Sequence, residues 1–135
     1  MDFMNIEEVR QACLAMHSAV EEGSPFADLG HPDIAFKIGG KIYAYLCVPD
    51  APSCQHADTS NLLVLKSDPD VALDIRDKYP DTIEAAWHWN KKYWNQIHYD
   101  KLPPDLIINL IAESFRLVVE KLPKRIKIEL GFQLP

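Results

Sequence analysis

One stretch with a period of two decides the fold, IAFKIGGKIYAYLCV at residues 34–48. Apolar side chains at Ile34, Phe36 and Ile38 alternate with smaller or charged ones, which is typical of a β-strand with one buried face. Two glycines follow, and such a pair supplies the positive φ angles of a tight turn. Because the alternation resumes after the glycines, the stretch predicts a β-hairpin.

The segments on either side of the hairpin predict a first helix and a third strand. Asn5 and Glu8 form an N-cap pair, and apolar residues then recur on one helical face up to about Ser18. Beyond the hairpin, residues 49–61 contain prolines and small polar residues, so we expect a long loop there. A short apolar run at residues 62–66 predicts the next strand.

The second half of the chain predicts two helices and the strands between them. One helix opens at Asp68-Pro69-Asp70 and stops at Pro80, because proline cannot continue a helix. The longest helix starts at Pro103-Pro104 and ends near Arg125. Strands are expected at residues 83–87 and 93–99, on either side of a turn at residues 90–92.

The tail and the order of elements complete the predicted fold. Apolar residues alternate again over residues 126–134, which predicts a strand that pairs with its own sheet or with a second copy of the chain as a homodimer. The order α-β-β-β-α-β-β-α predicts an α+β domain of two layers, an antiparallel sheet of about five strands with helices on one face. No linker is visible, so residues 1–135 are expected to form a single domain with a C-terminal strand-like extension at residues 124–135.

Charge and cysteine content limit the function classes. The net charge of -6 repels phosphate backbones, so nucleic-acid binding would need a local basic patch. Cys13, Cys47 and Cys54 are odd in number and form no CxxC motif, which indicates free thiols in a reducing compartment. No apolar run approaches the roughly 20 residues that cross a bilayer. We therefore expect a cytoplasmic protein without membrane association.

Several motifs resemble those of the MmcQ/YjbR-like proteins. The matching stretches are Val20-Glu21-Glu22 with Pro25-Phe26, Phe36-Lys37-Ile38-Gly39-Gly40-Lys41, Leu65-Lys66 with Asp68-Pro69, Tyr79-Pro80, His88 with Asn90-Lys91-Lys92 and Trp94, and Leu102-Pro103. The resemblance implies a CyaY-like α+β fold, in agreement with the order of elements, and the family is often labelled DNA-binding. The chain departs from the family pattern at Trp87, Trp89 and Tyr93, where tyrosine, methionine and histidine are usual.

The hairpin and the Trp-rich turn offer a basic and aromatic surface. Strand parity puts the lysines and tyrosines of the hairpin on the face opposite Phe36, Ile38 and Ile42. The candidate contact residues are Lys37, Lys41, Tyr43, Tyr45, Lys91, Lys92 and Trp94, with Lys66 and His98 as further neighbours. Lysines can contact phosphates while rings stack on bases, which favours single-stranded nucleic acid over duplex. The alternative is an ordinary solvated sheet face.

Two weaker candidates remain. His88 and Asn90 could bind an anion or a small ligand, whereas the alternative is a turn held by the Asn90 side chain. Cys54, His56 and Asp58 could ligate a metal, but no second ligand pair accompanies them, so no metal or other cofactor is expected. The sequence carries no GxSxG, P-loop or HExxH motif, and we expect a binding or interaction module rather than an enzyme.

Overall fold

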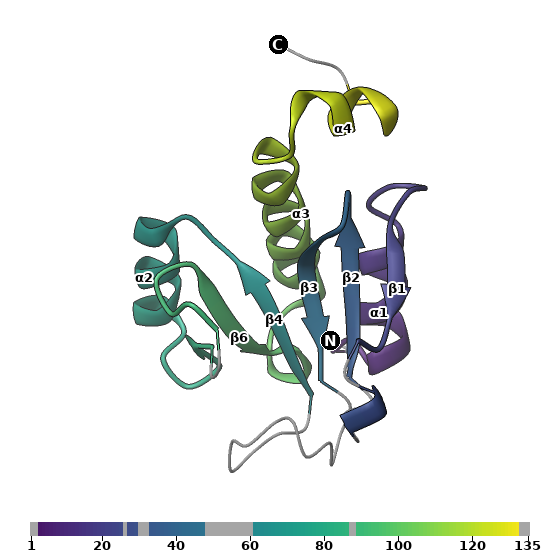
Figure 1. Cartoon of the computed structure of the whole chain (residues 1–135). Helices are drawn as coiled ribbons and strands as arrows, with labels where there is room; N and C mark the ends of the chain where they lie inside the picture. The colour runs from purple at the N-terminus through teal and green to yellow at the C-terminus, as the bar shows by residue number, and fades with distance from the viewer. Residues whose placement is uncertain (1–2, 26, 30–32, 48–60, 87–88, 133–135) are drawn as a thin grey trace.

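The computed structural model describes residues 3–25, 27–29, 33–47, 61–86 and 89–132 (Figure 1). The helices are α1 (Ile6–Leu14), α2 (Pro69–Lys78), α3 (Pro104–Glu120) and α4 (Lys124–Glu129), with short 3-10 helices η1 (Ala27–Leu29) and η2 (Tyr99–Lys101). The strands are β1 (Glu21–Gly23), β2 (Ile34–Ile38), β3 (Lys41–Leu46), β4 (Leu62–Lys66), β5 (Ile83–Ala85) and β6 (Trp94–His98).

The strands form one antiparallel sheet in the order β1-β2-β3-β4-β6-β5. Residues of all four helices pack against the main core on one face of this sheet, which we call the helix side. The predicted α+β class, with an antiparallel sheet and helices on one face, is confirmed. None of the described helices combines the length and apolarity that a bilayer crossing requires.

Local sequence signals account for the ends of the early elements. Asn5 caps α1: its Oδ1 accepts the Glu8 N–H at 2.8 Å, while Glu8 Oε1 accepts the Asn5 N–H at 3.0 Å. Gly39 and Gly40 turn the hairpin with φ values of 59° and 83°. The sequence does not predict β1, because all its residues are exposed and therefore show no alternation.

A bulge in β3 changes the predicted faces of the hairpin. The ladder skips Tyr43 between the pairs Phe36–Ala44 and Lys37–Ile42. Such an extra residue reverses the alternation on one strand. Tyr43 consequently packs on the helix side with 0% of its surface exposed, and its hydroxyl donates to the Cys13 carbonyl at 2.6 Å. The prediction that Tyr43 shares the outer face with Tyr45 is wrong, and Ile42 lies with Tyr45 instead.

The tail is a helix, so the strand predicted at residues 126–134 is wrong over its described part, residues 126–132. Ile126 and Leu130 are four residues apart, so the same pattern also puts them on one face of a helix, and both pack against the core. A Schellman motif ends α4: Gly131 has φ 85°, and the Phe132 N–H donates to the Lys127 carbonyl at 2.9 Å. Strand addition to a second copy through this segment has no structural basis in these residues.

Candidate functional site

A side chain of α3 separates β3 from β4 at one end of their ladder. The last registered pair is Ala44–Leu65, and the next two residues, Tyr43 and Lys66, are bridged by Ser114. Ser114 Oγ accepts the Lys66 backbone N–H at 2.9 Å and donates to the Tyr43 carbonyl at 2.5 Å. This fully buried hydroxyl satisfies two backbone groups that the sheet would otherwise pair. Beyond it the strands diverge, with α3 behind the opening (Figure 1).

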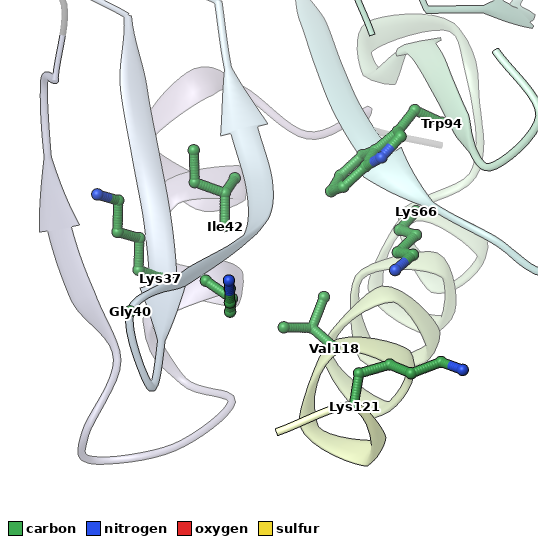
Figure 2. A pocket seen from close by; sticks show the side chains of 8 residues that line it. Lys37, Gly40, Ile42, Lys66, Trp94, Val118 and Lys121 are labelled. Carbon is green, nitrogen blue, oxygen red and sulfur yellow. The ribbon is translucent and has the colours of Figure 1, made fainter. Parts of the chain in front are cut away.

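A hollow of about 480 Å³ lies at this opening (Figure 2). Its apolar walls are Ile42 at the start of β3, Trp94 at the start of β6 and Val118 of α3. The charged residues that line it are Lys37, Lys41, Lys66 and Lys121. Its size falls within the range of about 300–1,000 Å³ typical of sites for small ligands. The hollow therefore combines an apolar wall with cationic groups.

The lysines of this hollow differ in their ion pairing from two arginines of the helices. The arginine pairs are Arg10 with Glu7 and Glu22, and Arg116 with Glu113 and Glu120. Hydrogen bonds from Arg116 hold the pKa of Glu113 below its ordinary value. Within the described ranges, no carboxylate forms an ion pair with any of the four hollow lysines. Four lysines without an ion pair in those ranges thus line one hollow in a chain of net charge -6.

The turn before Trp94 is fixed internally and by α2. Asn90 Oδ1 accepts the Lys92 N–H at 3.1 Å, and the Asn90 carbonyl accepts the Trp94 N–H at 3.0 Å. Asn90 is therefore a turn residue, as the alternative interpretation of the sequence predicts. Arg76 of α2 donates to the carbonyl of Lys91. These bonds hold the Trp94 backbone in place and leave the Lys91 and Lys92 side chains exposed.

An aromatic cluster covers part of the outer face of the sheet. The ring centroid of Trp89 lies 4.6 Å from that of Trp94 and 5.4 Å from that of Tyr45. Tyr45 lies on the predicted face but is only 6% exposed, and its hydroxyl donates to Asp33 Oδ2 at 3.0 Å. Its ring offers no free stacking surface. The half-buried rings of Trp94 and Tyr93 retain an accessible part.

The structure brings Lys37, Lys41 and Trp94 of the predicted contact residues together in the hollow. Lys91 and Lys92 lie on the adjoining turn, and the Tyr93 ring lies between Lys66 of the hollow and Lys92 of the turn. The amines of Lys66 and Lys92 each lie 5.7 Å from the centroid of the Tyr93 ring. This distance is that of a cation–π contact. The hollow and the turn therefore form one continuous basic and aromatic surface.

Sequence reasoning missed Ser114 and Lys121, which both belong to the α3 region. Strand parity says nothing about how a helix meets the sheet, so Lys121 could not be assigned to this surface. Ser114 carries a signal of its own, because it is a polar residue between Ile111 and Leu117 in a buried stripe. A buried hydroxyl needs a hydrogen-bond partner, and here it has two.

The remaining titratable candidates lie apart from the hollow. His98 is buried on the outer face, with its Nε2 3.7 Å from Glu84 Oε1. Burial raises the pKa of the Cys13 thiol to about 12, which keeps it protonated and a poor nucleophile. No group of three or more His, Cys, Asp or Glu side chains in the described segments could hold a metal ion. Four predicted candidates lie outside those segments: Cys54, His56, Asp58 and His88.

Comparisons with known proteins identify the family. A model of the YjbR family matches residues 15–117. The chain belongs to the YjbR family. It is 34% identical over 107 residues to the uncharacterized protein YbdF of Escherichia coli O157:H7. The aligned region covers 75% of this chain and 80% of that protein. The family match ends before α4, so the C-terminal helix lies outside it.

Two solved structures share the architecture of this YjbR-family chain. Deinococcus radiodurans protein DR2400, described with the domain DUF419, has a TM-score of 0.78 and 26% identity, over 97% of this chain and 91% of that one. A protein from Pseudomonas syringae has a TM-score of 0.68 and 23% identity, over 84% of this chain and 98% of that one. The second likeness concerns the fold alone.

Proposed function

We propose that this YjbR-family protein binds single-stranded nucleic acid through the hollow and the adjoining turn. The observation that carries the proposal is a hollow lined by Trp94 and by four lysines that form no ion pair within the described part of the chain. In this arrangement Lys37, Lys41 and Lys66 contact phosphates while bases stack on Trp94 and Tyr93. Stacking on an aromatic side chain contributes about 1–3 kcal/mol per base.

The turn lysines and the accessible parts of the Trp94 and Tyr93 rings favour an unpaired strand. Lys91 and Lys92 extend the cationic surface beyond the hollow, so several phosphates of one strand can be contacted. A duplex hides the faces of its bases within the stack, whereas a single strand can present them to Trp94. Tyr43 and Tyr45, which the sequence suggested as stacking residues, take no part because both are buried.

Fluorescence anisotropy with a labelled oligothymidylate tests the proposal. Lys37→Gln with Lys41→Gln should weaken binding about tenfold or more at low salt, and lower the slope of log affinity against log salt by about 1.4, because each phosphate contact of a single strand contributes about 0.7. The matched control is Lys78→Gln with Lys101→Gln, which makes the same charge change outside the hollow. Absence of binding at low salt, or an equal loss in both double variants, would contradict the proposal.

A further inference from the structure

We infer that the hollow holds one nucleotide with a terminal phosphate monoester, either as a free mononucleotide or as the phosphorylated end of a strand. This inference rests on the proposed function, because it names the part of a nucleic acid that occupies the site. It follows from the limits of the hollow, its charge and the chemistry of its walls.

The hollow is limited along the strands. At one end the Ser114 bridge and the Ala44–Leu65 pair close the gap between β3 and β4. Val118 of α3 lines it from the helix layer. A volume of about 480 Å³ suits a single small molecule. A continuous strand would need a groove that runs past the hollow in both directions.

An acidic neighbour limits the hollow on the side of β2. Glu21 of β1 is the cross-strand partner of Lys37, so the two side chains lie on the same face of the sheet. Glu21 is exposed. A strand that continued beyond Lys37 would bring its next phosphate toward this carboxylate, and two like charges repel each other. The sugar-phosphate backbone of a bound strand is therefore expected to end in the hollow.

The cationic charge exceeds what one internal phosphate needs. An internal phosphodiester carries a single negative charge, whereas a terminal monoester carries about -1.5 to -2 at neutral pH. Lys37, Lys41 and Lys66 line the hollow, and Lys121 stands at its rim with its amine directed away from Ile42 (Figure 2). Figure 2 shows the Lys37 amine directed toward β1, so Lys41 and Lys66, on opposite walls, are the lysines nearest to an anion inside the hollow. Two ammonium groups match the charge of a monoester better than that of a diester.

The walls offer a stacking surface but no means of reading a base edge. Apart from lysines, the described lining residues are Gly40, Ile42, Trp94 and Val118, which carry no side-chain amide, hydroxyl or carboxylate. Trp89 packs against Trp94 and fixes the position of its ring. The base is thus recognised by its face. Purines should bind more tightly than pyrimidines because their ring area is larger, with little preference between adenine and guanine.

Isothermal titration calorimetry with adenosine monophosphate, adenosine and inorganic phosphate tests the two parts of the ligand. The monophosphate should bind at least about tenfold more tightly than adenosine or phosphate, since it combines stacking with the charge contacts. Lys66→Gln and Trp94→Leu should each weaken it about tenfold, whereas the control Lys78→Gln should not. Circular dichroism establishes that each variant is folded. Equal binding of inorganic phosphate and the monophosphate would overturn the role of Trp94.

A second pair of ligands separates this inference from the proposed function. A 5′-phosphorylated oligonucleotide should bind about tenfold more tightly than the same strand with a 5′-hydroxyl, and adenosine monophosphate should displace it. If the strand binds equally well with either end and the monophosphate does not compete, the inference is wrong and the proposed function stands. If the monophosphate binds but neither strand does, the proposed function is wrong and the free nucleotide is the ligand. If nothing binds, both are wrong.

Discussion

Tyr43 and Tyr45 stand two residues apart on β3, yet they serve opposite sides of the sheet. On the helix side, Tyr43 is fully buried, donates to the Cys13 carbonyl and meets Phe115 edge-on at 5.1 Å. On the outer side, Tyr45 supports Trp89 beside the lysine hollow. On the helix side the hydroxyls of Tyr43 and Ser114 donate to backbone carbonyls, whereas the outer side leaves ammonium groups without ion pairs in the described chain. The contacts that stabilise the fold thus lie mainly on the helix side, and the surface proposed for binding lies on the other.

The largest effect is expected from a cavity on the helix side. Ile111→Ala should lower the free energy of unfolding by about 2–5 kcal/mol, because the Ile111 side chain is fully buried in the core and its loss leaves a cavity. Lys66→Gln on the outer side should change it by less than about 0.5 kcal/mol. Urea denaturation measures both. Equal losses from the two variants would break the division between the sides.

The next effect concerns the bridge between β3 and β4. Ser114→Ala removes both hydrogen bonds of the hydroxyl and should cost about 1–3 kcal/mol, since the Tyr43 carbonyl and the partly buried Lys66 N–H then lose this partner. Hydrogen exchange of the Lys66 amide should accelerate at the same time. Unchanged exchange at this amide would show that Ser114 does not hold the strands apart.

A smaller effect is expected from the hydroxyl of Tyr43. Tyr43→Phe keeps the ring in the core and removes only its bond to the Cys13 carbonyl, which should cost about 1 kcal/mol. Binding of the oligonucleotide should stay the same, because Tyr43 faces the helices. Thermal denaturation and anisotropy measured on the same sample check both statements. A loss of affinity without a loss of stability would place Tyr43 in the binding surface.

The last effect is confined to alkaline solution. Burial raises the pKa of Cys13 from 9.0 to about 12, and burial raises that of Tyr99 from 10.0 to about 12. A raised pKa means that the folded chain holds protons that the unfolded chain releases. These groups thus contribute stability below pH 9 that is lost as the pH rises toward 12. Urea midpoints between about pH 8 and 11 should fall, and Cys13→Val should reduce the fall. A midpoint that stays constant in the parent protein would contradict this.

Most of the fold could be predicted because its signals are local. The hairpin at residues 34–46, the cap at Asn5 and the proline starts of α2 and α3 all depend on neighbouring residues. The bulge at Tyr43 could not be predicted, because it depends on the register between two strands. The strand prediction for the tail was wrong for another reason. The pattern over residues 126–132 is compatible with both a strand and a helix with one buried face, and only packing decides between them.

The candidate site could be predicted only in part. Lys37, Lys41 and Trp94 were found because strand neighbours are encoded in the sequence pattern. The burial of Tyr45 could not be anticipated, since Trp89 reaches it from a distant turn. The hollow itself arises where Ser114 of α3 meets two strands, a contact between residues far apart in the chain. Such tertiary geometry has no counterpart in periodicity.

The short ladder between β3 and β4 has a mechanical consequence. Only Ala44–Leu65, Tyr45–Val64 and Leu46–Leu63 are in register there, whereas β4 and β6 pair along the whole of both strands. The sheet thus consists of two three-stranded blocks, β1-β2-β3 and β4-β6-β5, joined by a narrow seam. Bending at this seam would change the width of the gap between the blocks. A molecule held in the gap would act as a spacer and stiffen the whole sheet.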